Sequence, residues 1–156
     1  MRIDDHPEQG VSAKGLRIAV VTAVFNESIT SGLKAGAIEF LEESEADEIL
    51  AIDAPGAFEL PLLAQHLATS GYDAIVCLGA VIEGDTDHYE HVAHRASEGL
   101  MRVQLDTGVP VAFGILTTRN VESAVVRSEQ GPENKGREAA AAAVITAQTL
   151  RQIRTT

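Results

Sequence analysis

The stretch AIVCLGAVI, residues 74–82, contains nine uncharged residues, most of them with apolar side chains. A second stretch, LRIAVVTAV at residues 16–24, has the same apolar and β-branched character, with Arg17 as its one charge. Continuous apolar runs of this length, without alternation of apolar and polar residues, are typical of strands that are covered on both faces. Both stretches therefore predict buried strands of a parallel sheet.

The segments that follow these strands show the spacing of amphipathic helices, as at Ile29, Leu33 and Ala37. We expect helices at residues 29–43, 58–70, 87–107, 121–126 and 134–153, and two further strands at residues 48–52 and 111–116. Alternation of strands and helices predicts a parallel sheet with helices on both faces, joined by right-handed crossovers. The expected fold is thus α/β: a three-layer α/β/α sandwich with a four-stranded parallel sheet, of the flavodoxin-like kind.

The length of 156 residues suits a single domain, which can bury a core without a disulfide or a metal. We expect this domain to span residues 15–156. Residues 1–14 are polar, and we expect this N-terminal extension to become ordered only when it packs against something else. Cys77 is the one cysteine and lies in an apolar run, which favours a buried, unreactive thiol in a reducing compartment.

The formal net charge of −11 argues against non-specific nucleic-acid binding, which requires a basic surface. No apolar stretch approaches the roughly 20 residues that a membrane span needs, and the first fifteen residues lack the apolar run of a signal peptide. We therefore expect a cytoplasmic protein that binds neither nucleic acid nor membrane.

In parallel sheets of this kind, ligands bind outside the carboxyl ends of the strands. Phe25 follows the first expected strand, and its ring is either a stacking face for a flat heterocycle or part of the core. Phe58 and Glu59 follow the second strand, just before Pro61 begins a helix. The Glu59 carboxylate either accepts hydrogen bonds from substrate hydroxyls or complements the helix dipole.

The segment after the third strand reads EGDTDHY at residues 83–89. Asp87 with Glu90 three residues later predicts a capping box at the start of a helix. Free backbone N–H groups at such a helix start can bind a phosphate, to which Thr86 would add its hydroxyl. His88 lies in the first turn, where an imidazole could transfer protons near neutral pH.

His91 and His94 follow His88 at steps of three residues, so a metal site has to be considered. Three residues turn a helix by about 300°, so the later histidines drift off the face of the first. The segment HYEHVAH also differs from the HExxH pattern of zinc proteases. We therefore expect no metal.

Arg127 and Lys135 follow the fourth strand and are the cations that could hold a phosphorylated ligand against the overall negative charge. Alternatively, both pair with neighbouring glutamates on a solvated surface. Composition alone does not favour either interpretation over the other. The sequence contains no Walker-type phosphate loop, no GxGxxG and no GxSxG motif. Nucleotide hydrolysis, dinucleotide redox chemistry and serine-type acyl transfer therefore lack their usual residues.

Four motifs occur in order along the chain: PGAFELP at 55–61, GAVIEGDTDHYEHV at 79–92, GVPVAFGILTT at 108–118 and NKGREAAAAA at 134–143. Together they resemble the lumazine synthase family, over about residues 16–151. The resemblance implies condensation of 5-amino-6-(D-ribitylamino)uracil with 3,4-dihydroxy-2-butanone 4-phosphate, without a cofactor. The products would be 6,7-dimethyl-8-ribityllumazine, phosphate and water, in the penultimate step of riboflavin biosynthesis.

The same resemblance assigns roles to the strand-end residues, with His88 as the catalytic acid and base. The residues implied to hold the pyrimidine and the ribityl chain are Phe25, Ala57, Phe58, Glu59, Ala80, Val81, Ile82 and Phe113, the last from a neighbouring subunit. The residues implied to bind phosphate are Asp85, Thr86, Arg127 and Lys135.

The resemblance further implies a homo-oligomer, either a pentamer or a 60-subunit shell of pentamers, with active sites between subunits and residues 1–14 along a neighbour. Two features depart from the family pattern. Glu83 and Asp85 add carboxylates beside the expected phosphate site, and residues 128–133 read SEQGPE. Two alternatives thus remain, a non-catalytic module that binds flavin or lumazine and a structural homologue that forms shells.

Overall fold

A four-stranded, entirely parallel sheet forms the centre of the chain in the computed structural model, which describes residue 8 and residues 10–156. The strands are β1 (Arg17–Ala23), β2 (Glu48–Ala54), β3 (Ala74–Ile82) and β4 (Val111–Thr118). Their spatial order is β2-β1-β3-β4, so β1 and β3 are central and β4 is an edge strand. The apolar runs that predicted buried strands are β1 and β3, and apart from Arg17 and Ile82 their residues are buried.

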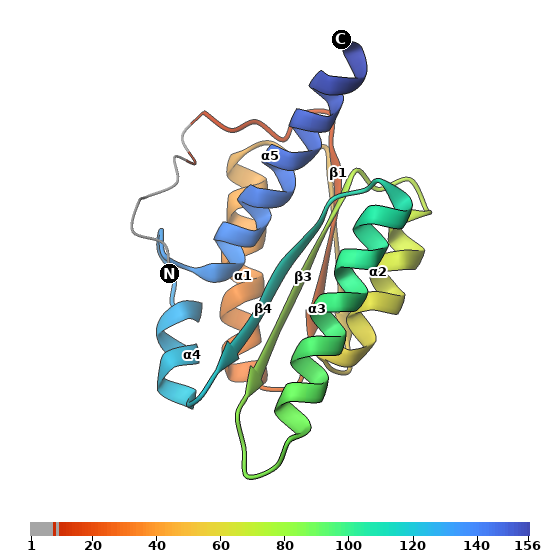
Figure 1. Cartoon of the computed structure of the whole chain (residues 1–156). Coiled ribbons are helices and arrows are strands. Elements are labelled where there is room, and N and C mark those ends of the chain that lie inside the picture. The colour runs from red at the N-terminus through yellow and green to blue at the C-terminus, as the bar shows by residue number, and fades with distance from the viewer. Residues whose placement is uncertain (1–7, 9) are drawn as a thin grey trace.

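Helices cover both faces of the sheet (Figure 1). They are α1 (Glu27–Glu43), α2 (Leu60–Ala68), α3 (His88–Thr107), α4 (Val121–Ser128) and α5 (Lys135–Thr155), with a short 3-10 helix η1 (Ala57–Glu59) before α2. α1, α4 and α5 share one apolar core with one face of the sheet, and η1, α2 and α3 share a second core with the other. The predicted three-layer α/β fold is confirmed. Within the described residues, no helix combines the length and the apolarity that crossing a membrane requires.

The expected helix at residues 58–70 is instead a 3-10 turn followed by the shorter α2. Pro61, the second residue of α2, has no N–H group to donate, which favours the separation of the two turns. The helix also ends earlier than predicted, because the Thr69 and Ser70 hydroxyls donate to the carbonyls of Gln65 and His66.

Glycines let α1 come into close contact with the end of α4 and the start of α5. A Cβ atom at Gly136 would overlap the Leu33 carbonyl oxygen of α1. Cβ atoms at Gly32 and Gly36 of α1 would overlap the Ser128 carbonyl oxygen and the Asn134 side chain. Because these contacts involve backbone atoms and a fully buried side chain, a methyl group could be accommodated only by moving a helix.

The described part of the N-terminal extension packs on its own chain. The Ala13 side chain is fully buried, and its backbone N–H donates to the Ser44 carbonyl at 2.7 Å. Arg137 of α5 lies over the Phe40 ring and pairs with Glu8 at 2.8 Å and with Glu43 at 2.7 Å. Residues 1–7 and 9 lie outside the described residues, so packing of this extension on a neighbour stays a prediction.

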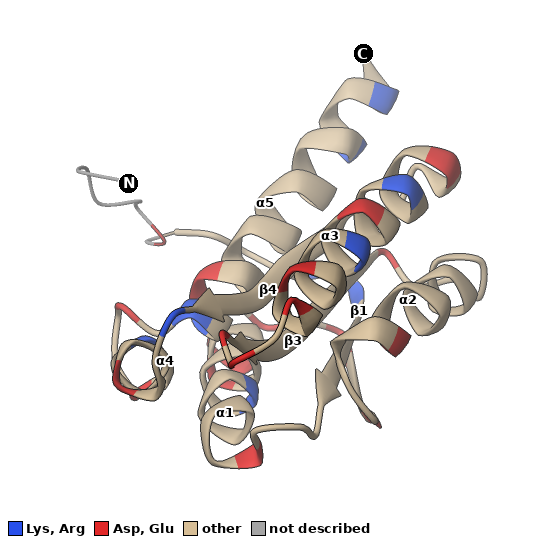
Figure 2. Cartoon of the chain, turned by 60° about the horizontal axis from the view of Figure 1, so that its bottom comes forward, with Lys and Arg blue, Asp and Glu red and all other residues tan. Residues whose placement is uncertain are grey.

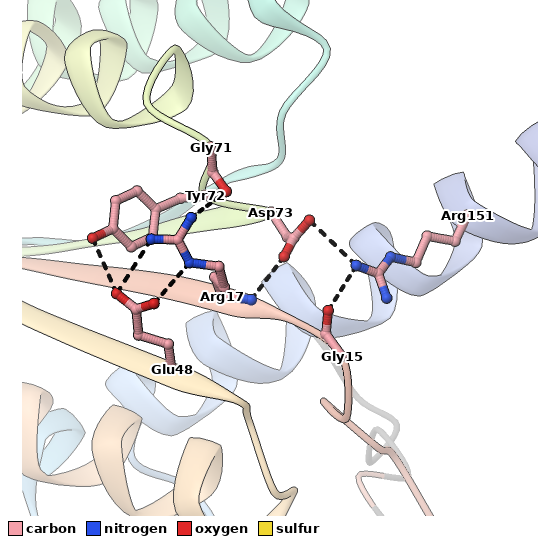
Figure 3. Close-up of polar contacts among 7 residues, drawn as sticks. All are labelled: Gly15, Arg17, Glu48, Gly71, Tyr72, Asp73 and Arg151. Carbon is pink, nitrogen blue, oxygen red and sulfur yellow. Dashed lines mark hydrogen bonds and ion pairs between the residues drawn. The ribbon is translucent and has the colours of Figure 1, made fainter.

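A polar network closes the amino ends of the strands, at the opposite end of the sheet from the expected ligand site (Figure 3). The Arg17 guanidinium donates to Glu48 from Nε at 2.7 Å and lies 4.8 Å from the centre of the Tyr72 ring. Asp73 accepts from the backbone N–H of Arg17 at 2.7 Å and from Arg151 of α5 at 3.3 Å. The hydrogen bond from Arg17 is the main reason why the pKa of Glu48 lies below its ordinary value.

The single cysteine lies in the middle of β3. Cys77 is fully buried, and burial raises the pKa of its thiol to about 12. The prediction of a buried thiol is confirmed.

Replacing Gly136 with alanine should destabilise the chain, although alanine normally stabilises a helix relative to glycine by up to about 1 kcal/mol. The new methyl group would force α1 and α5 apart, at a cost of about 1–3 kcal/mol in the free energy of unfolding. Urea denaturation of Gly136→Ala measures this. Gly84→Ala is the control, because a methyl group there meets no heavy atom of the described residues within 4 Å. Equal stability of the two variants would contradict the tight contact.

Glu48→Gln should lower stability at neutral pH and have little effect in acid. Because the pKa of Glu48 is lower in the folded state, its charge contributes stability above the ordinary carboxyl pKa of about 4.3. That contribution disappears as the pH falls through the folded-state pKa. Urea denaturation of both proteins at neutral pH and near pH 3 would measure the gap between them, and a gap that does not shrink in acid would rule out the charge as its cause.

Candidate active site

Phe25 and the segment around η1 lie together beyond the carboxyl ends of β1 and β2. The Phe25 backbone N–H donates to the Pro55 carbonyl at 3.2 Å, and a Cβ atom on Gly56 would lie 2.6 Å from the Phe25 ring. The Phe25 and Phe58 side chains are 68% and 60% exposed. Phe25 is therefore not part of the chain's core, and both rings are available to contact a planar ligand.

Glu59 folds back on the turn that precedes it. Its Oε2 accepts from the backbone N–H of Gly56 at 3.0 Å, and its backbone N–H donates to the Gly56 carbonyl at 3.3 Å. One carboxylate oxygen thus holds the Pro55–Gly56 turn against Phe25, while the side chain stays exposed. The sequence left open a contact with substrate hydroxyls or with the helix dipole, and this hydrogen bond to the preceding turn is a third role, which fixes where the carboxylate lies.

Asn26 was missed by the sequence reasoning. Its backbone is left-handed, with φ at 63°, and its Nδ2 donates to the Ala80 carbonyl at 2.9 Å. The contact ties the turn after β1 to the end of β3. The signal that could have identified it is an asparagine shortly after a strand, because asparagine is one of the few residues that adopt a left-handed backbone readily.

The end of β3 is less covered by backbone pairing than the rest of the strand. The register of β3 with β1 ends at Leu78, whereas its register with β4 continues to Ile82. Residues 79–82 of β3 therefore have no backbone pairing with β1. On that side, the Asn26 amide donates to the Ala80 carbonyl. Ala80 and Val81 have buried side chains, so backbone groups are what this strand end can offer to a ligand.

The segment between β3 and α3 is exposed and rich in carboxylates. Glu83, Asp85, Thr86, Asp87 and His88 are all exposed. The predicted capping box is wrong, since Asp87 makes no side-chain cap hydrogen bond. Its backbone is already helical, with φ −72° and ψ 0°, rather than extended as in a capping residue. Instead the Thr86 hydroxyl accepts from the His88 backbone N–H at 3.4 Å, which brings these two residues together.

No group of three or more His, Cys, Asp or Glu side chains is placed to hold a metal ion in the part of the chain that the structure describes. His88, His91 and His94 are each exposed along α3.

A groove of about 450 Å³ runs along the open edge of β4. Its walls are residues 112–118 of β4 and side chains of α4 and α5: Arg127, Lys135, Glu138, Ala139 and Ala142. Phe113 lies in the groove and is 49% exposed. Basic positions thus lie where β4 meets α4 and α5, whereas the segment that leads from β3 to α3 carries acidic ones (Figure 2).

The two cations of the groove differ in their partners. Lys135 Nζ pairs with Glu138 Oε2 at 2.6 Å, so the alternative of pairing with a glutamate holds for this residue. Arg127 is exposed and donates from Nη1 to the Ser123 carbonyl of its own helix at 2.8 Å. That hydrogen bond uses one of the five N–H groups of the guanidinium and fixes it to α4.

The chain therefore presents the expected site residues in two sets. One set lies beyond the carboxyl ends of β1, β2 and β3 and includes Phe25, η1 and the start of α3. The other set, with Phe113, Arg127 and Lys135, lines the β4 groove, and no residue of the first set is part of that lining.

The family model for 6,7-dimethyl-8-ribityllumazine synthase matches residues 15–151. The chain is 52% identical over 143 residues to 6,7-dimethyl-8-ribityllumazine synthase 1 of Caulobacter vibrioides. The matched region covers 88% of this chain and 92% of the relative. It is 47% identical over 150 residues to a 6,7-dimethyl-8-ribityllumazine synthase of Streptomyces avermitilis, covering 94% and 93%. A protein of that name from Nitratidesulfovibrio vulgaris is 44% identical over 149 residues, covering 94% and 96%.

Proposed function

The chain belongs to the 6,7-dimethyl-8-ribityllumazine synthase family, and we propose on this basis that it is the enzyme that makes this lumazine in riboflavin biosynthesis. The observation that carries the proposal is the match to the family over residues 15–151, together with relatives up to 52% identical along nearly their whole length. These comparisons do not favour a non-catalytic binding module or a purely structural shell protein. The substrates are 5-amino-6-(D-ribitylamino)uracil and 3,4-dihydroxy-2-butanone 4-phosphate.

In this proposal the pyrimidine binds beyond the carboxyl ends of β1 and β3. The exposed ring of Phe25 supplies a stacking face, and the backbone at the end of β3, where the β1 ladder has stopped, supplies donors and acceptors for the pyrimidine edge. Phe58 and Glu59 lie on the adjoining turn and would contact the ribityl chain. Ala57, Ala80, Val81 and Ile82 complete this half of the site.

The phosphorylated substrate binds at the start of α3. Backbone N–H groups of the first helical turn and the Thr86 hydroxyl suit a phosphate, and His88 lies directly beside them. Glu83 and Asp85 add negative charge at the same place, which opposes an anion. A cation is therefore needed, and Arg127 with Lys135 would supply it from a second copy of the chain, since within one chain they line the separate β4 groove.

This division of the site is the reason to propose a homo-oligomer. The β4 groove of one copy would face the strand ends of the next, with Phe113 completing the pyrimidine pocket. Such head-to-tail contacts close into a ring, and we expect a pentamer, either alone or as the unit of a 60-subunit shell. The extension at residues 1–14 would contact a neighbour, and the enzyme would act in the cytoplasm.

The reaction needs proton transfers but no change of redox state, so His88 and water suffice without a cofactor. The 5-amino group attacks the butanone carbonyl, and loss of water gives an imine. Elimination then expels phosphate, whose charge Arg127 stabilises. The resulting enol tautomerises to a ketone, and the ribitylamino nitrogen closes the second ring with loss of another water. Holding the two reactants in register supplies much of the acceleration.

Turnover tests the proposal directly. The purified protein should form 6,7-dimethyl-8-ribityllumazine when both substrates are supplied, with the lumazine absorbance as the measurement, and should form none when either is omitted. Binding of the pyrimidine without turnover would instead identify a non-catalytic module. Light scattering on the same preparation measures the size of the assembly.

Arg127→Ala should raise the KM for the butanone phosphate by about 10- to 100-fold, which corresponds to the loss of a charge-assisted hydrogen bond. Affinity for the pyrimidine should change little, because that ligand carries no phosphate. Steady-state kinetics measures the KM, and calorimetric titration with each ligand measures the two affinities. Arg119→Ala is the matched control, since Arg119 is also exposed near α4 but is not part of the groove lining. Equal loss of affinity for both ligands in Arg127→Ala would contradict the assigned role.

A further inference from the structure

Asn134 is a polar side chain buried inside the chain, and its partners connect three helices. It is 1% exposed, and its Oδ1 accepts from the backbone N–H of Arg137, which caps α5. Its Nδ2 lies 3.0 Å from each of three carbonyl oxygens, those of Gly32, Ser128 and Glu129. The amide thus joins α1, the end of α4 and the start of α5 through one side chain.

These partners lie directly beside the two cations of the β4 groove. Ser128 and Glu129 follow Arg127 in the chain, and Asn134 precedes Lys135. The last carbonyls of a helix lack donors within the helix, and here the Asn134 amide supplies them. Asn134 therefore makes hydrogen bonds both to the end of α4 and to the start of α5, on either side of the connecting segment 129–134.

The guanidinium moves with the end of α4. The Arg127 guanidinium donates to the Ser123 carbonyl of its own helix. The position of α4 therefore determines the position of the guanidinium. α4 has only eight residues and is too short to be held by its own helical hydrogen bonds. The position of α4 therefore depends on the contacts that its last residues make with the rest of the chain. The absence of side chains at Gly32 and Gly36 lets α1 approach closely enough for the Asn134 amide to reach it.

We infer that Asn134 is a positioning residue for anion binding, which holds the ends of α4 and α5 that carry Arg127 and Lys135. This inference rests on the proposed function, which makes these two residues the phosphate cations. The amide acts through the backbone of α4 and α5 and does not touch the ligand.

Asn134→Ser separates positioning from capping. Serine keeps a hydroxyl that can accept from Arg137 and cap α5, but it removes the amide that donates to the three carbonyls. Calorimetric titration of the intact assembly with inorganic phosphate should show about tenfold weaker binding, the size of a lost charge-assisted hydrogen bond. The KM for the butanone phosphate should rise by a similar factor, with the KM for the pyrimidine unchanged.

The decisive measurement is a double-mutant cycle with Arg127→Ala. If Asn134 acts by positioning the guanidinium, Asn134→Ser should weaken phosphate binding by a clearly smaller factor once Arg127 is absent, because only its effect through Lys135 is then left. An undiminished loss in the Arg127→Ala background would overturn the inference, as would unchanged phosphate affinity in a folded Asn134→Ser protein.

Asn120→Ser is the matched control, because Asn120 caps the start of α4 by accepting from Ser123 at 2.8 Å and should leave phosphate affinity unchanged. Gln130→Ala is a milder variant that removes a second, exposed hydrogen bond to the Gly32 carbonyl at 3.1 Å. Gln130→Ala should weaken phosphate binding by about twofold. If Asn134→Ser does not fold, this variant becomes the test, and unchanged phosphate affinity in Gln130→Ala would contradict the inference. A wild-type protein that binds phosphate but forms no lumazine would refute the proposed function alone, since the cycle measures phosphate binding without turnover.

Discussion

The contact between the backbones of α1 and the start of α5 is the constraint on which the groove side of the molecule depends. Gly136 meets the Leu33 carbonyl with no room for a side chain, and Gly32 and Gly36 bring α1 equally close to α4 and to Asn134. Because backbone atoms cannot move aside as a flexible side chain can, these contacts fix the three helices relative to one another. The position of α5 along the sheet, and with it one wall of the groove beside β4, follows from them.

The two sets of site residues depend on different kinds of structure. The set at the strand ends rests on the parallel sheet, whose β1 and β3 both deliver their following segments to one edge, with the Asn26 amide joining them. The groove set rests on helix packing around Asn134, outside the open edge of β4. In the proposed homo-oligomer, the edge strand β4 and the groove beside it would face a second copy of the chain.

The sheet and its layers could be predicted because continuous apolar runs such as residues 74–82 have few structural alternatives. Exposure of Phe25 could not be decided from its position, because an aromatic residue after a strand fits both a core and a binding face. The capping box at Asp87 failed because the backbone of Asp87 is helical rather than extended, and a sequence motif does not reveal backbone angles. Asn134 was read as part of a motif and not as a junction, since its partners in α1 lie about a hundred positions earlier in the chain. Close approach of helices through glycine depends on tertiary packing that local sequence patterns do not encode.

The depth of Cys77 has a practical consequence. A sulfur atom that is enclosed on all sides, with burial holding its proton in place, will not react with maleimides or iodoacetamide while the chain stays folded. Any cysteine substituted at the surface would therefore be the sole labelling position in a molecule that needs no prior removal of its native sulfhydryl. Fluorophores or spin probes could be attached one at a time along the groove beside β4.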